Sequence, residues 1–281
     1  MSARDVARRV EPTGSPELDP LPAQPELVLR SFAYWMAQYR RTWRGSAITT
    51  VLEPLGFLAA MGFGLGLLVD RGSGSVTLGG VGYLEFIAPG LLAATSMQTA
   101  TFESTYPVMG SIKWHRTYHG MLATPLRTVD TLAGHLLFVA FRLTVTATVF
   151  FLVMLLFGAI PSVWGILAVP AAVLTGLAFA PAIFAFSATV EDQSAYAMLF
   201  RFGIMPMFLF SGTFFPISQL PGWLEPAALV VPLWHGVDLA RDLALGQPSP
   251  GSAAVHVGYL LLWAVGGFLL AAWRFEKRLV E

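Results

Sequence analysis

The chain has 281 residues, of which 55% are hydrophobic and 12% are charged, and its mean hydropathy is +0.64. A soluble domain carries about 25% charged residues, so this chain has too few to cover a water-exposed surface, and the composition indicates a membrane protein. The formal net charge of +0 gives no indication of nucleic-acid binding. The absence of cysteine excludes disulfides, thiolate metal sites and cysteine nucleophiles.

The first 44 residues divide into two parts. Residues 1–26 combine arginines with several prolines and lack the apolar core of a secretory signal, so we expect a disordered, proline-rich cytoplasmic tail. Residues 27–44 place aromatic side chains at helical spacing among arginines. This pattern is typical of an amphipathic helix at the membrane interface. A simple basic flank to the first membrane span is the alternative.

Six apolar segments follow, each close to the roughly 20 residues that a bilayer requires. They are 47–69, 83–109, 132–158, 165–190, 195–215 and 252–273. The sequence therefore predicts an all-α polytopic membrane protein with a six-span transmembrane domain over residues 45–281.

Basic residues predict the orientation of these spans. Nearly all lysines and arginines flank the spans on the side of the N-terminus, and the opposite side holds only Arg71 and Arg241. Because cytoplasmic loops carry the excess of basic residues, we expect both termini in the cytoplasm and the protein in a bacterial inner membrane.

Residues 214–235 are apolar but are interrupted by Pro216, Pro221, Pro226 and Pro232. No single helix can cross a membrane through these prolines. We expect a re-entrant helical hairpin, shielded by protein, before the last span. A plain extracellular loop is the alternative, and a polar segment follows as far as residue 250.

Sequence motifs for catalysis are missing. A phosphate-binding loop needs Gly-Lys-Ser or Gly-Lys-Thr, yet the two lysines, Lys113 and Lys277, follow Ile112 and Glu276. No His-Glu-x-x-His or Gly-x-Ser-x-Gly motif occurs. His115 and His119 have the spacing of a metal-binding pair, but no third ligand is evident. We therefore expect no catalytic residue, metal site or cofactor in this chain.

Ionisable residues within the spans are costly and tend to be paired or functional. The candidates are Glu53, Glu103, His135 and Arg142. Glu103 should lie about 9 Å from the inner end of the second span and Arg142 about 15 Å along the third, at 1.5 Å per residue. A long arginine side chain narrows this difference. The hypothesis is an intramembrane ion pair of Glu103 and Arg142; reception of an anionic lipid or saccharide phosphate by Arg142 is the rival.

Five runs of residues carry a resemblance to a known family. They are VLEPLGFLAAMGFGLGLLV from Val51, YLEFIAPGLLAATSMQTATFES from Tyr83, KWHRTYHGMLATPL from Lys113, FRFGIMPMFLFSGTFFPISQLPGWLE from Phe200 and PLWHGVDLAR from Pro232. Together they resemble the ABC-2 type permeases, above all the nodulation-factor (lipooligosaccharide) export branch, with the daunorubicin-resistance permeases as relatives. The run FSGTFFPISQLP, residues 210–221, is the most specific of these matches.

The resemblance implies partners and sites. Two copies of the chain would work with two cytoplasmic ABC ATPase subunits, which would bind ATP and Mg, and with membrane lipids around them. Residues 111–127 would form the segment that couples to the ATPase, flanked by the interface helix 27–44. The coupling candidates are Lys113, Trp114, His115, Arg116, Tyr118 and His119. Because Trp114 and Tyr118 are four apart, we expect them on one helical face.

The function that follows is export of an amphiphile, with no choice made between a lipid-linked saccharide and a hydrophobic drug (multidrug efflux). The candidate pathway or gate residues are methionines and phenylalanines, which adapt to varied shapes, although ordinary core packing explains them equally. They are Met97, Met205, Met207, Phe208, Phe210, Phe214 and Phe215. An ion-gradient-driven transporter or channel is the alternative, and it would need more buried carboxylates or a repeated half.

Overall fold

The computed structural model describes residues 24–66 and 80–280, and within these ranges the chain forms helices and turns without a strand. The predicted tail 1–26 therefore lies almost wholly outside the described residues. In chain order the elements are α2 (Gln24–Ala59), η2 (Ala60–Gly66), α5 (Tyr83–Ser104), α6 (Tyr106–Lys113), α7 (Thr117–Leu122), α8 (Thr128–Leu156), η3 (Val163–Leu167), α9 (Ala168–Thr189), α10 (Ser194–Met198), η4 (Leu199–Ile204), α11 (Met205–Phe210), η5 (Ile217–Gln219), α12 (Glu225–Val230), α13 (Pro232–Leu245) and α14 (Pro250–Leu279).

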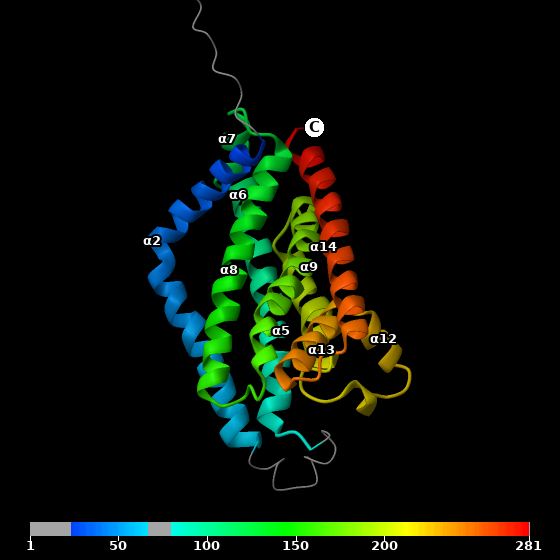
Figure 1. Cartoon of the computed structure of the whole chain (residues 1–281). Helices are drawn as coiled ribbons and strands as arrows, with labels where there is room; N and C mark the ends of the chain where they lie inside the picture. The colour runs from blue at the N-terminus through cyan, green and yellow to red at the C-terminus, as the bar shows by residue number, and fades with distance from the viewer. Residues whose placement is uncertain (1–23, 67–79, 281) are drawn as a thin grey trace, which may run out of the picture.

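The first helix is longer than the sequence suggests. No break separates the predicted interface helix, 27–44, from the first span, because α2 is one helix of 36 residues that bends along its course (Figure 1). Only Gly45 stands at the predicted junction, and a helix tolerates one glycine at a cost of about 1 kcal/mol. Placement of residues 27–44 at a membrane surface stays a prediction.

Four helices in the described ranges are long and apolar enough to cross a membrane. They are Gln24–Gly62, Thr128–Leu156, Val163–Thr189 and Pro250–Leu279. The second predicted span is interrupted, since α5 ends at Ser104 and α6 begins at Tyr106. The fifth corresponds to a shorter apolar helix, Ser194–Phe210, which contains the π-helical turns of η4 just before Pro206. The count of six spans stays a prediction.

Helix α9 is the centre of the bundle and packs against α5, α8, α13 and α14. Its sequence is rich in alanine and includes Gly176, and such small residues let neighbouring helices approach closely. A Cβ on Gly176 would lie 2.6 Å from the side chain of Leu143 on α8, and one on Gly267 of α14 would lie 2.9 Å from the backbone of Ala182. Small residues on α9 therefore set the spacing of the bundle.

The proline-punctuated segment is broken into short elements, as its prolines predict. Pro226 and Pro232 each stand in the first turn of a helix, where proline is tolerated. Helix α13 has 14 residues, about 21 Å at 1.5 Å per residue, which is too short to cross a hydrocarbon core of about 30 Å. The segment predicted to be polar up to residue 250 is helical as far as Leu245, because α13 continues to that residue and packs against α5 and α9.

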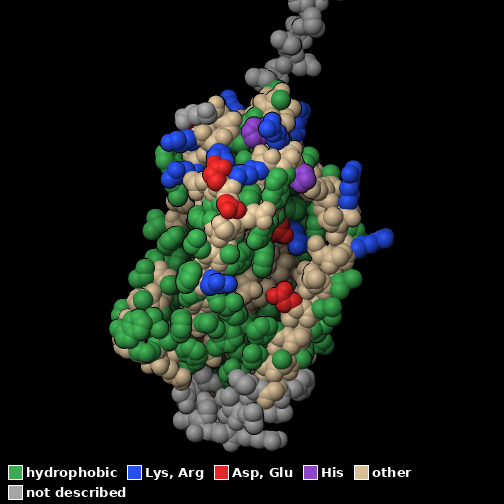
Figure 2. Space-filling view, turned by 180° about the vertical axis from the view of Figure 1, so that it is seen from behind, with side chains coloured by type: hydrophobic (Ala, Val, Ile, Leu, Met, Phe, Trp, Pro, Cys, Tyr) green, Lys and Arg blue, Asp and Glu red, His purple; other side chains and the backbone are tan. Residues whose placement is uncertain are grey.

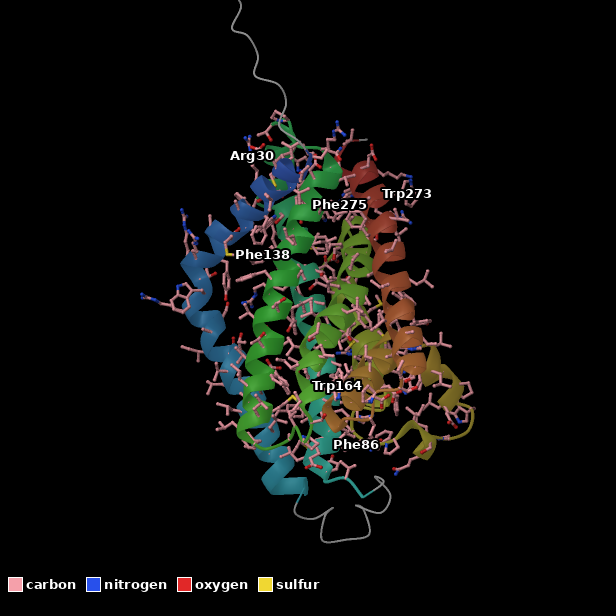
Figure 3. The ribbon with its side chains drawn as sticks, in the orientation of Figure 1. Arg30, Phe86, Phe138, Trp164, Trp273 and Phe275 are labelled. Carbon is pink, nitrogen blue, oxygen red and sulfur yellow. The ribbon has the colours of Figure 1, made fainter. Side chains whose placement is uncertain are left out.

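The two ends of the bundle differ in composition. The start of α2, the helices α6 and α7 and the end of α14 lie together at what we call the α7 end, and α12 and α13 lie toward the opposite, α12 end (Figure 1). Lysine, arginine and histidine side chains gather toward the α7 end, and the remainder of the same face is largely hydrophobic (Figure 2). Figure 3 shows Arg30 and Phe275 near the α7 end and Phe86 near the other.

Candidate functional site

The α7 end presents a sharp corner between α6 and α7. Helix α6 ends at Lys113, and Arg116 then adopts a left-handed backbone conformation (φ 48°), after which α7 begins at Thr117. A non-glycine residue in this region is uncommon and marks a tight change of direction. Four of the six predicted coupling residues are exposed on this corner: Trp114, His115, Arg116 and His119.

Tyr118 does not belong to the exposed surface. The expectation that it shares a helical face with Trp114 was wrong, because the left-handed Arg116 ends one helix before the next begins. The side chain of Tyr118 is fully buried, and burial raises its pKa well above 10. Its hydroxyl shares a hydrogen bond of 2.6 Å with Nδ1 of His135, which anchors α7 to α8.

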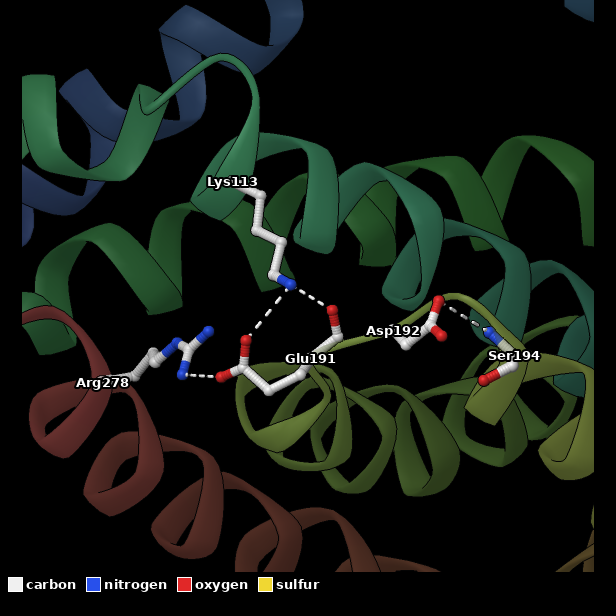
Figure 4. A network of polar contacts seen from close by, with 5 residues as sticks. All are labelled: Lys113, Glu191, Asp192, Ser194 and Arg278. Carbon is white, nitrogen blue, oxygen red and sulfur yellow. Dashed lines mark hydrogen bonds and ion pairs between the residues drawn. The ribbon is translucent and has the colours of Figure 1, made fainter.

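The same corner is held by an ionic network (Figure 4). Glu191, in the turn between α9 and α10, accepts a hydrogen bond from Arg278 at the end of α14 and forms an ion pair with Lys113, whose Nζ lies 3.2 Å from Oε2. The hydrogen bonds from Arg278 and then Lys113 lower the pKa of Glu191 to about 2. The network links α6, the α9–α10 turn and α14 behind the exposed corner.

Sequence reasoning missed Glu191 as a functional residue. The available signal was its position: Glu191 and Asp192 are the acidic pair between two apolar segments, on the side where basic residues concentrate. An acidic residue beside a basic surface can form ion pairs with it. Its two partners come from segments 78 and 87 residues away, so the sequence alone did not identify them.

Within the bundle, Glu103 of α5 and Arg142 of α8 form an ion pair, with Nε of the arginine 2.9 Å from Oε1 of the glutamate. Their side chains are 20% and 12% exposed. The guanidinium also lies over the ring of Tyr39 on α2, 4.9 Å from its centroid, which adds a cation–π attraction. Three helices therefore meet at this pair, and the proximity that the sequence suggested is present.

A recess of about 210 Å³ adjoins the pair, and its lining residues come from α2, α5, α6 and α8. It is lined by Trp35, Gln38, Tyr39, Thr42, Ser46, Glu103, Pro107, His135, Phe138 and Arg142. Two buried donors in this lining, Trp35 Nε1 and Arg142 Nη1, have no hydrogen-bond partner within the described part of the chain. Buried donors are normally satisfied, so the recess suits a group that accepts hydrogen bonds. Figure 2 shows an acidic and a basic side chain together within a hollow of this face.

A second recess of about 420 Å³ is mostly apolar and lies between α5 and the helical segment Ser194–Phe210. Its lining includes two predicted pathway residues, Met205 and Phe208, together with Phe102, Phe200 and Arg201. The lining thus combines an apolar surface with one cation.

The other pathway candidates are dispersed. Met97 is fully buried in the main core, where it packs between helices, and its assignment to a pathway stays a prediction. Met207 and Phe214 are partly buried against the same core, and Phe214 stacks edge-on to Phe208 at 5.0 Å. Phe210 is the last residue of α11 and is 39% exposed, and Phe215 lies in the loop between α11 and η5.

The sequence assigned Arg241 only to the side opposite the N-terminus, and the structure places its side chain, partly buried, between elements. Its Nε donates to the carbonyl of Phe86 at 3.1 Å and its Nη2 to the carbonyl of Gly212 at 2.7 Å. The guanidinium lies 3.9 Å from the centroid of the Phe86 ring. Arg241 therefore connects α13 with α5 and with the loop that follows α11.

The comparisons with known proteins agree with the motifs. Residues 75–273 match the family described as ABC-2 family transporter protein. The chain is 33% identical over 254 residues to nodulation protein J of Rhizobium leguminosarum bv. trifolii, covering 88% of this chain and 94% of that protein. It is 31% identical over 254 residues to nodulation protein J of Rhizobium leguminosarum bv. viciae (88% and 95% covered) and 32% identical over 262 residues to that of Bradyrhizobium diazoefficiens (90% and 97%).

The resemblance inferred from the motifs is thus confirmed. It extends over most of the chain, since the relatives align with nearly nine tenths of it. The chain belongs to the ABC-2 family of transporter proteins and is similar within it to the nodulation J proteins.

Proposed function

We propose that this chain is the permease subunit of an ATP-driven exporter and that a separate cytoplasmic ATPase docks on the corner between α6 and α7. The observation that carries the proposal is the exposed Trp114, 57% accessible, beside Arg116 and His119. Exposed tryptophan and arginine are the residue types that most often dominate the energy of protein interfaces.

The structure around this corner suits transmission of force. Tyr118 anchors α7 to α8, and Lys113 joins α6 to Glu191 and through it to α14. A movement of the corner would therefore be transmitted to α8, α9 and α14. Rigid, packed connections of this kind are what coupling between distant sites requires.

The cargo that we propose is an amphiphile. The apolar recess near Met205 and Phe208 suits a hydrocarbon or aromatic portion, and Arg201 lies in the same lining. The recess beside Glu103 and Arg142 offers donors and acceptors for a polar portion. Both a lipid-linked saccharide and a hydrophobic drug with a polar group fit this division. Two copies of the chain, with two ATPases, would complete the exporter.

The experiment is co-expression with an ABC ATPase whose reading frame adjoins this gene, should one be found there, followed by purification and a hydrolysis assay with and without added amphiphile. Trp114→Ala should reduce co-purification at least about tenfold, because removal of a central interface tryptophan costs about 2 kcal/mol or more. Trp223→Ala is the matched control, since this tryptophan is also exposed (77%) but precedes α12 at the other end. Equal ATPase recovery with both variants would contradict docking on this corner.

A further inference from the structure

Three titratable side chains near the α12 end form a row of close polar contacts, two of them hydrogen bonds and one an ion-pair contact. His235 and Asp238 lie on α13, and His256 lies on α14. The contacts run from the Leu229 carbonyl to His235 Nε2 (3.1 Å), from His235 Nδ1 to His256 Nδ1 (2.8 Å), and from His256 Nε2 to Asp238 Oδ2 (3.2 Å). All four ring nitrogens thus have a partner, and the row joins α13 to α14.

The row requires a definite number of protons. A carbonyl only accepts, so His235 Nε2 must carry a proton. Two ring nitrogens 2.8 Å apart cannot bond through two lone pairs, so a second proton lies between the Nδ1 atoms. A third lies between His256 Nε2 and the carboxyl of Asp238, because a lone pair facing a carboxylate would be repulsive.

Two neutral imidazoles and an ionised carboxylate supply only two of these three protons. We propose that the cluster of His235, His256 and Asp238 is a proton-binding site, which holds one additional proton and thereby fastens α13 to α14. With that proton the cluster has no net charge, whether the proton makes an imidazolium beside a carboxylate or a carboxylic acid beside two neutral rings. The inference does not depend on the energy source of transport.

The surroundings are compatible with such a site. The two histidines are 7% and 4% exposed, and burial favours the uncharged cluster over one with an uncompensated negative charge. The Asp238 side chain is 34% exposed, so protons can reach the row from water. Tyr259 of α14 stacks on His235 with ring centroids 4.0 Å apart.

The remaining charged groups on α13 are Arg241 and Asp242. The guanidinium of Arg241 bonds the carbonyls of Phe86 and Gly212 and also interacts electrostatically with Asp238, whereas Asp242 interacts with His256 and Asp238. Helices α9 and η3 pack against α13 and carry no titratable side chain, whereas α5 carries Tyr83, Glu85 and Glu103 and α12 carries Glu225. The charge of Asp242 favours retention of the proton, and the charge of Arg241 opposes it.

The sign of the pH dependence follows from the proton count. In the unfolded chain an imidazole gives up its extra proton near pH 6.5, whereas the folded row holds it. The stabilising contact is therefore present at low pH and is lost as the pH rises through the value at which the folded cluster releases its proton. Release removes the attraction between His256 and Asp238 and leaves an uncompensated negative charge between α13 and α14.

Asp238→Asn tests the proposal without breaking the row. The amide donates to His256 Nε2, His256 Nδ1–H donates to His235, and His235 Nε2–H donates to Leu229, so every contact is kept with no additional proton. In lipid nanodiscs, we expect the melting temperature of the wild type to fall by about 2 to 4 °C between about pH 5 and pH 9. The variant should start near the wild-type value and lose this dependence.

His119→Asn is the matched control, because His119 is exposed and outside the row; it should keep the wild-type pH dependence. A wild type whose melting temperature does not fall with pH, or an Asp238→Asn variant with an unchanged slope, would overturn the proposal. Should that variant fail to fold, ¹⁵N spectra of labelled histidines and the infrared carboxyl band of the wild type decide the question. A histidinium or a protonated carboxyl near pH 7 supports the proposal, and finding neither overturns it.

Discussion

Truncation of Glu103 should destabilise the bundle through the charge that it leaves behind. Glu103→Ala removes the acceptor at 2.9 Å from Arg142 and leaves a guanidinium, 12% exposed, among apolar helices. Removing one partner of a fully buried ion pair costs about 3 to 5 kcal/mol. Since this pair borders a recess and Tyr39 still attracts the cation, we expect about 2 to 3 kcal/mol, which lowers the melting temperature by about 4 to 12 °C.

The assay is thermal unfolding in detergent or nanodiscs, followed by tryptophan fluorescence. Glu53→Ala is the matched control, because Glu53 is also a glutamate in an apolar helix but is exposed and has no ion-pair partner among the described residues. The double change with Arg142→Ala should be less harmful than the sum of the single changes by about 1 to 3 kcal/mol. The exchange Glu103→Arg with Arg142→Glu should recover part of the membrane yield.

Strict additivity of the two alanine changes, or an effect of Glu103→Ala no larger than that of Glu53→Ala, would refute a structural role for the pair. Normal stability of Arg142→Ala with loss of transport for acidic cargo alone would instead favour a substrate contact at this position.

Further predictions concern orientation, packing and pH. A cysteine at Ser249 should react with an impermeant reagent added outside intact cells, and one at His119 only after permeabilisation; labelling of the latter in intact cells would contradict a cytoplasmic α7 end. Tyr118→Phe removes the hydroxyl that is hydrogen-bonded to His135 and should cost about 1 to 3 kcal/mol by denaturant unfolding, and no loss would mean that the hydrogen bond does not stabilise the fold. Because the folded-state pKa of Glu191 is lowered from 4.5 to about 2, its contribution is present above 4.5 and lost as the pH falls toward 2. The difference in melting temperature between wild type and Glu191→Gln should therefore be constant from about pH 5 to pH 8 and shrink below about pH 4, and a difference that shrinks instead between pH 5 and 8 would argue against the network.

The candidate site was only partly predictable. The Glu103–Arg142 pair could be predicted because each residue is an ion in an apolar segment, and consecutive helices usually neighbour each other. The exposed part of the coupling corner could be predicted from the sequence because polar residues cluster between two apolar segments. Tyr118 was misplaced because helical spacing presumes an unbroken helix, and the left-handed Arg116 breaks it.

Residues whose partners are distant in sequence were missed. His235 contacts a histidine 21 residues away on another helix, and Arg241 bonds a carbonyl 155 residues earlier in the chain. Backbone carbonyls carry no sequence signal, since every residue has one. No local sequence pattern therefore predicted that Arg241 would bond to carbonyls of α5 and of the loop after α11.

By itself, the sequence determined the membrane class, the helical fold, the breaks at prolines and the ABC-2 family, because hydropathy, periodicity and motifs are properties of short stretches. Tertiary structure alone decided which helix lies at the centre, that Met97 is core and that α13 is buried. It also decided which charges meet across helices, as Glu191 does with its two basic partners. The physical reason is that burial and pairing depend on the close approach of distant segments, which the small residues of α9 permit and the order of residues does not display.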